Sequence, residues 1–303
     1  LETREFTRVG SNEAIRVDVR VVAATHRDLQ AMVVDKRVRE DFFFRLNAVN
    51  ITARDYPIEP FLVFTEFRMD RPVFGPHPHA GISVLTYMLP DSKTGFINRD
   101  SNGDHSRMEP GGLHITQAGR GIHHDEFPEE TGVTAHGFQI WINHADKDRL
   151  SEPKAIHAAA NEVPEVETGD YRVRIVHGSF EGKTPEYKLL TAVTLLHVFL
   201  NAGKSILLPA GEMAFVYGLS GSGASGGTTF SAQNLLNFDT NSGSVEIEAG
   251  ENGCELMFGT GMLLREPITY GGPFVATTPE QLAEIRRRYG RGEMGHLLPY
   301  ENF

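Results

Sequence analysis

Short runs rich in β-branched and aromatic residues follow one another along most of this chain. From Pro57 onward the runs are separated by turn clusters such as Pro90-Asp91-Ser92 and Pro110-Gly111-Gly112. Evenly spaced short strands with turns of this kind are typical of β-sandwiches and β-barrels. The predicted strands are 61–64, 82–89, 113–115 and 137–142 in the first half, and 171–176, 195–200, 213–219 and 245–247 in the second half.

A short helix is predicted near the C-terminus. The segment Thr278-Pro279-Glu280-Gln281 has the form of a capping box with proline at the first helical position. Leu282, Ile285 and Tyr289 then follow on one helical face, and Gly290 is a natural end.

The first 56 residues differ from the rest. They contain ten Lys or Arg and nine Asp or Glu, whereas the whole chain has a net charge of −11. Ile15, Val17, Val19 and Val21 alternate with polar residues, which predicts a strand. One strand and a short helix cannot bury enough apolar surface to fold alone.

Composition excludes several classes of protein. No apolar run approaches the roughly 20 residues that span a bilayer, and the N-terminal residues have no signal-peptide pattern. The single cysteine, Cys254, excludes an internal disulfide and is typical of a reducing compartment, so we expect a cytoplasmic protein. The net charge of −11 argues against direct binding of nucleic acid by the whole surface.

Candidate metal ligands are concentrated between Phe74 and Glu126. His77 and His79 form a His-x-His pair, and alternate residues of a strand point to the same face. The segment His123-His124-Asp125-Glu126 offers a second pair, either His123 with Asp125 or His124 with Glu126. A slip of one residue exchanges these pairs, so the pattern leaves both open. Two such pairs on facing strands would form a metal site of imidazoles and a carboxylate.

The motifs HPHAG, EPGG and QAGRGIHHDEFP resemble the pirin family, metal-binding members of the cupin superfamily. The resemblance implies two tandem jelly-roll barrels, the second without metal, and names His77, His79, His124 and Glu126 as ligands. Many cupins carry Glu four residues after the second His, where this chain has Ser83. The carboxylate ligand would then be Glu126, as in pirins.

The resemblance also implies a function. Four N and O ligands leave open positions for substrate and O₂ on a six-coordinate metal. The affinity order of divalent metals alone favours copper or nickel, whereas the family implies Fe(II), with Mn, Ni, Cu, Co or Zn as alternatives. We expect an oxidoreductase of the quercetin 2,3-dioxygenase type, acting on a flavonol and O₂, in which Glu126 also accepts the substrate's hydroxyl proton. His114 and Gln117 are expected near this pocket. The alternative is a metal- or redox-responsive protein that binds a protein partner without turnover.

A second resemblance concerns the N-terminus. Residues 15–29 and 39–47 are similar to parts of the AAA+ activators that remodel alternative-sigma-factor polymerase. No phosphate-binding loop accompanies them. The segment Gly178–Thr184 is one residue short of such a loop, and Pro185 opposes the helix that should follow it. We therefore expect no ATP chemistry.

These patterns predict an all-β protein with a small N-terminal α/β fragment. The expected parts are an AAA+-like fragment without function (1–56), a metal-binding barrel (57–150), a crossover (151–170), a barrel without metal (171–275), and a helix with a tail (276–303). We also expect Arg16–Ala24 to pair, in part, with the exposed edge of the first barrel, because the fragment occupies the place of strands that pirins usually have there.

Overall fold

A computed structural model of the chain describes residues 5–7, 14–16, 49–239 and 243–300. Contacts divide the chain into two units, Leu1–Asn47 and Ala48–Phe303. In the first unit, strand β1 (Glu5–Thr7) pairs antiparallel with β2 (Ala14–Arg16). The rest of the predicted strand at 15–21, and the segment 39–47, lie outside the described residues.

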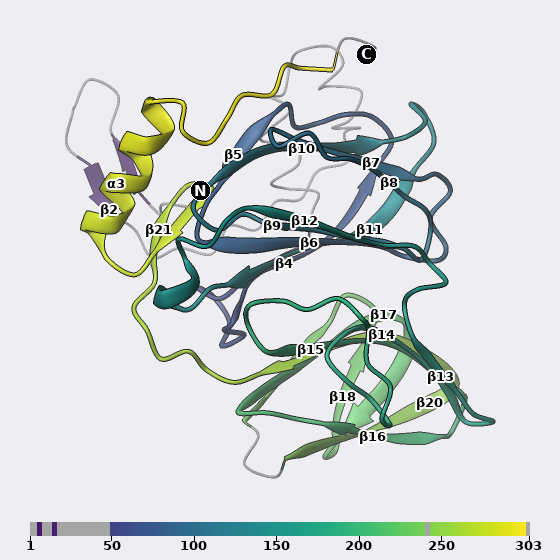
Figure 1. Ribbon diagram of the computed structural model, residues 1–303. Helices are drawn as coiled ribbons and strands as arrows, with labels where there is room; N and C mark the ends of the chain where they lie inside the picture. Colours follow the sequence, from purple (N-terminus) through teal and green to yellow (C-terminus); the bar gives the residue numbers. More distant parts are fainter. Residues whose placement is uncertain (1–4, 8–13, 17–48, 240–242, 301–303) are drawn as a thin grey trace. The chain divides into compact units, whose positions relative to one another are not determined.

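The first barrel of the second unit consists of two sheets (Figure 1). The six-stranded sheet has the order β12 (Lys154–Ala158), β9 (Leu113–Gln117), β6 (Ile82–Met88), β11 (Ala135–Asn143), β4 (Phe61–Met69), β3 (Val49–Thr52). The four-stranded sheet has the order β5 (His77–His79), β10 (Ile122–Pro128), β7 (Phe96–Asp100), β8 (His105–Met108). A short 3₁₀ helix, η1 (Asp146–Asp148), follows β11.

Both faces of the six-stranded sheet are covered, since all seven residues of β6 are buried. Leu85 and Tyr87 point to one face and join the largest apolar core, together with residues of the second barrel such as Phe215 and Met257. Val84 and Thr86 point to the other face, toward the four-stranded sheet. The sheet thus presents an apolar face to the second barrel and a partly polar face to the interior of the first.

The second barrel has a mostly apolar interior. Its eight strands are β13 (Glu165–Glu167), β14 (Tyr171–His177), β15 (Val193–Leu200), β16 (Ser205–Pro209), β17 (Met213–Ser225), β18 (Thr228–Ser231), β19 (Leu235–Asp239) and β20 (Ser244–Gly261). Seventeen buried apolar residues form its own core, among them Leu196, Val216 and Phe258. The predicted fold, two β-barrels in tandem, is confirmed.

The C-terminal segment returns to the first barrel. Strands β21 (Thr269–Gly271) and β22 (Phe274–Ala276) form a hairpin, and helix α3 (Pro279–Gly290) follows with the predicted capping box. The amide of Val275 donates to Ala80 O (3.0 Å), directly beside the turn at Gly81. Gly81 has φ +80°, and a Cβ there would lie 2.0 Å from Val275 O, so this contact requires glycine. The predicted end of the second barrel at residue 275 stays a prediction.

Strand β3 lies beside β4 at the edge of the six-stranded sheet. Most of the segment 16–24, which we expected to pair in part with an exposed edge of the first barrel, lies outside the described residues, so that expectation stays a prediction. Ile51 pairs with Phe64, and its side chain joins the core between the barrels. β4 has β11 as its other neighbour, so no further strand can pair with it.

Among the described residues, no helix is long and apolar enough to cross a membrane.

Candidate metal centre

The pairing of β5 with β10 sets which histidines share a face. His77 lies opposite His124, and Pro78 lies opposite His123. Directly opposed residues of an antiparallel pair project to the same side. His77, His79 and His124 therefore face the barrel interior together, and His123 faces outward.

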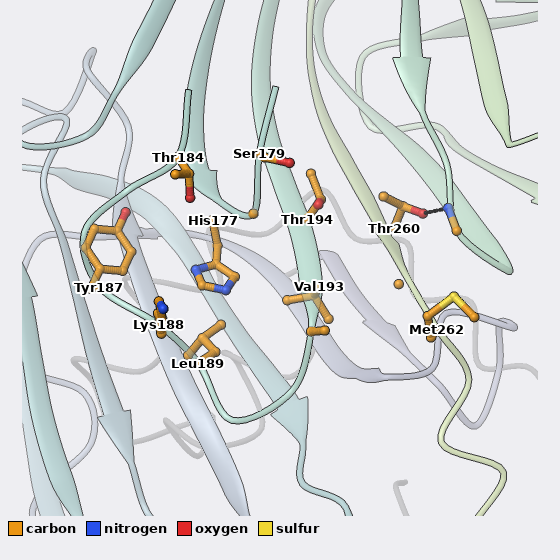
Figure 2. A pocket seen from close by; sticks show the side chains of 14 residues that line it. His177, Ser179, Thr184, Tyr187, Lys188, Leu189, Val193, Thr194, Thr260 and Met262 are labelled. Atoms are coloured by element: carbon orange, nitrogen blue, oxygen red, sulfur yellow. Dashed lines mark hydrogen bonds between the residues drawn. The ribbon is translucent and has the colours of Figure 1, made fainter. Parts of the chain in front are cut away.

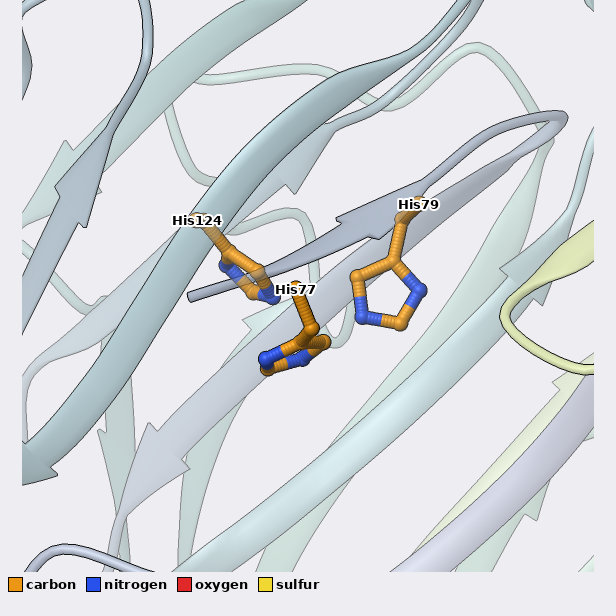
Figure 3. Close-up of side chains that lie close together, drawn as sticks. All are labelled: His77, His79 and His124. Atoms are coloured by element: carbon orange, nitrogen blue, oxygen red, sulfur yellow. The ribbon is translucent and has the colours of Figure 1, made fainter. Parts of the chain in front are cut away.

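The three inward histidines converge on one point (Figure 3). One ligand nitrogen from each lies within 4.8 Å of the other two. The ring centroids are 4.8 to 4.9 Å apart. Burial lowers the pKa of His79 and His124 well below the ordinary value, with a smaller lowering for His77. Neutral imidazoles are the form that binds a metal.

The surrounding hydrogen bonds leave the same nitrogen of each ring for a ligand. Nδ1 of His77 donates to Gly75 O (2.9 Å), and Nδ1 of His79 donates to Pro273 O (3.2 Å). Nδ1 of His124 lies 3.3 Å from both Thr116 Oγ1 and Asn98 Oδ1. Nε2 of His79 and of His124 are buried without a partner among the described residues. This is the arrangement found in metal sites, in which the second ring nitrogen is anchored by the protein, so the triad could hold a metal ion.

Glu126 is on the same face of β10 as His124 but is not part of the cluster of converging nitrogens. Its Oε1 accepts from Thr86 Oγ1 (2.6 Å), and its Oε2 accepts from Gln139 Nε2 (2.7 Å). Burial raises the pKa of Glu126 to about 7, even though both hydrogen bonds oppose this. A cation held by the three imidazoles would favour the ionised carboxylate.

The alternative pair, His123 and Asp125, lies on the outer face. Asp125 forms an ion pair with Arg99, whose Nε donates to Oδ1 (3.0 Å). The ring of His123 packs against that of Tyr289 (5.5 Å between centroids). The C-terminal segment covers this side of β10. Because both side chains point outward, neither residue reaches the triad.

Two rows of side chains across the six-stranded sheet complete the site, and sequence analysis missed most of them. His114, Thr86 and Gln139 are directly opposed across β9, β6 and β11, and Thr116, Val84 and Trp141 form the next row. Apart from Val84, their signal in the sequence is a polar or aromatic residue at the inward positions of strands that are otherwise apolar. The ring of Trp141 lies 4.9 Å from that of His79, and its Nε1 is buried without a partner among the described residues.

The two expected neighbours of the pocket differ in position. His114 is in the row beside Glu126, and both of its ring nitrogens lack a hydrogen bond within the described part of the chain. Gln117 lies on the opposite face of β9, where its Nε2 donates to Glu152 O (3.1 Å). The expectation for Gln117 was wrong, because odd-numbered residues of β9 face the second barrel.

The fold and the site define a bicupin whose first barrel could hold a metal ion. Comparison with known families agrees: residues 50–142 match the Pirin model and residues 195–295 match the Pirin C-terminal cupin domain. A "Pirin-like protein" of Solanum lycopersicum is 30% identical over 244 residues, covering 78% of this chain and 82% of its own length. This chain belongs to the pirin family.

Other similar proteins have names that suggest an activity. A protein of Pseudomonas aeruginosa named "Putative quercetin 2,3-dioxygenase" is 29% identical over 253 residues, covering 77% of this chain and 86% of its own length. The structure of a quercetin 2,3-dioxygenase from Acinetobacter baumannii superposes with a TM-score of 0.74 at 21% identity, covering 82% of this chain and 92% of the other. The bacterial pirin YhhW from Escherichia coli, in complex with nickel(II), has a TM-score of 0.53 at 19% identity, covering 67% of this chain and 83% of the other. The two structures support the fold.

The resemblance at the N-terminus is also confirmed. Residues 1–52 match the Sigma-54 interaction domain. This match overlaps the Pirin match at residues 50–52, which lie in strand β3.

Proposed function

We propose that this protein is a metal-dependent dioxygenase that cleaves a flavonol such as quercetin. The observation that carries the proposal is the convergence of three anchored imidazoles beside a buried carboxylate. The name of the Pseudomonas aeruginosa relative supports the same chemistry.

His77, His79 and His124 would hold the metal through Nε2, because Nδ1 of each ring is bonded to the protein. Three nitrogen donors and a carboxylate suit iron(II), which is our proposal for the native metal. When bound, the metal would supply the activation of substrate and O₂.

Glu126 would accept the hydroxyl proton of the flavonol, and it would serve as a fourth ligand if its carboxylate turned toward the triad. Thr86 and Gln139 hold both of its oxygens, which orients the carboxylate. Trp141 would pack against the flat ring system and donate its free Nε1–H to a substrate oxygen.

Oxygen uptake by the iron-loaded protein with quercetin tests the proposal. We expect O₂ and quercetin to disappear in equal amounts, and we expect Glu126→Gln to lower the turnover number by about 10²- to 10⁴-fold with metal content retained. The outward variant Asp125→Asn is the matched control and should retain most of the activity. A fully metal-loaded protein without oxygen uptake would contradict the proposal and favour a regulatory protein that binds a partner.

A further inference from the structure

A cavity of about 460 Å³ lies in the second barrel, away from the candidate metal centre (Figure 2). It forms under the long connection between β14 and β15, residues 178–192. Its volume is in the range of sites for small molecules. None of the histidines of the triad lines it.

His177 provides a polar group inside this cavity that has no partner. Its side chain projects between Tyr187 and Val193 (Figure 2). Only 8% of His177 is exposed, and its Nδ1 forms no hydrogen bond with any described residue. The ring lies nearly parallel to that of Tyr187 (27°, 6.1 Å between centroids), whose hydroxyl donates to Val176 O (2.7 Å). A buried ring nitrogen without a partner costs free energy unless another group bonds to it.

The charges around the cavity favour an anion. Lys188 lines it, whereas its fourteen lining residues include no Asp or Glu. Three residues with hydroxyl side chains, Ser179, Thr184 and Thr194, also line the wall, and the hydroxyl of Thr184 donates to Pro185 O (3.4 Å). Leu189, Val193 and Met262 add an apolar surface, so the cavity combines one cation and several hydroxyls with space for an apolar group.

Gly178, Ser179 and Thr184 of the cavity wall belong to the segment 178–184, which resembles a phosphate-binding loop only in composition. Phe180 and Lys183 bond to each other through both backbone amides (3.1 and 3.0 Å), which closes a tight turn. Nζ of Lys183 donates to Glu165 O (2.6 Å). These amides and this ammonium group are therefore occupied, and a nucleotide phosphate would not be held as in such a loop.

We propose that this cavity is a second ligand site, which takes a small organic carboxylate with an apolar body of about the size of benzoate. The carboxylate bonds to Lys188 and the neighbouring hydroxyls, and the apolar body lies against Leu189, Val193 and the stacked rings. Nδ1 of His177 forms a hydrogen bond to an oxygen of the same carboxylate. A charge-assisted bond to Lys188 makes the carboxylate group necessary for binding.

Titration of the full-length, metal-loaded protein by ¹⁹F NMR tests this site, with 4-fluorobenzoate as the probe and neutral 4-fluorobenzyl alcohol as its matched control. We expect the carboxylate to bind about tenfold or more tightly than the alcohol. Lys188→Met should weaken binding of the carboxylate about tenfold, with little effect on folding because Lys188 is exposed. His177→Phe should weaken it while retaining the ring stack, and the surface variant Lys147→Met should bind as the parent protein does.

The candidate metal centre is the competing location for the probe, so His124→Ala is measured in parallel. Unchanged binding in this variant, with weakened binding in Lys188→Met, supports the second site, whatever the outcome of the oxygen-uptake experiment. Equal affinity for the alcohol and the carboxylate, or full affinity in Lys188→Met, overturns the proposal. Absence of binding by 4-fluorobenzoate also overturns it.

Discussion

The two barrels share a fold but have opposite interiors. Inward positions of the first barrel include three histidines, a glutamate and their hydrogen-bond partners. The corresponding interior of the second barrel is an apolar core that includes Leu196, Val216 and Phe258. Strand spacing, turns and the core between the barrels therefore suffice for the fold, and a few inward side chains decide whether a barrel can hold a metal ion.

The sharpest test of this comparison is to change the two adjacent histidines of β10. We expect His124→Ala to lose nearly all bound metal, because it removes one of three converging nitrogens. His123→Ala should keep metal content within about twofold, because His123 faces outward and can affect the metal site only indirectly. Metal per chain is measured by plasma mass spectrometry after the same loading protocol. The reverse order would show that the ligands lie on the outer face of β10.

The second barrel should respond in stability rather than in metal binding. Phe258 is fully buried in the apolar core, so Phe258→Ala should lower the free energy of unfolding by about 3–5 kcal/mol. Urea denaturation gives this value, and metal per folded chain should change by less than about twofold. A large loss of metal in the folded fraction would mean that the two barrels are not independent in this respect.

Much of the fold was predictable from the sequence because alternation and turn chemistry are local signals. The capping box at Thr278 and the same-face pair His77 and His79 follow from spacing alone. The choice of His124 over His123 needed the family resemblance, because one residue of register exchanges the faces of a strand.

Other features depend on pairing between distant segments, which no local pattern reveals. The return of β21 and β22 to the first barrel joins Val275 to Ala80. The edge strand β3 lies within the part that was assigned to the AAA+-like fragment. His177 lies at the end of β14, where a bulge after Ile175 places it opposite Leu195, and its cavity depends on the path of the connection that follows.

A smaller effect on metal binding is expected from a change to a residue that holds the imidazole ring of His124 in place. Thr116→Val removes one of the two oxygens beside Nδ1 of His124, and Asn98 Oδ1 remains. We expect metal affinity to fall about tenfold, the low end for such partners. Competition with a chelator of known affinity gives the value. The matched control is Thr229→Val on the exposed surface of the second barrel, and equal affinities for the two variants would contradict the role of Thr116.

The smallest effect concerns the stability of the fold at acidic pH, and it is tested on one buried histidine from each barrel. His144 bonds to Ser83 Oγ (2.8 Å), and His177 lines the second-barrel cavity. Burial lowers the pKa of His144 to about 3 and that of His177 to about 4.

The unfolded chain takes up protons on these histidines near pH 6.5, whereas the folded chain does not until a lower pH. The stability they contribute is therefore complete above about pH 7 and is lost as the pH falls toward the folded-state values. Each site should account for about 1 kcal/mol of the decrease in unfolding free energy between pH 6 and pH 5. Urea denaturation at pH 7, 6 and 5 should show a shallower decrease for His144→Gln and for His177→Gln than for the parent protein. A slope equal to that of the parent in either variant would mean that the histidine concerned is protonated in the folded protein at these pH values.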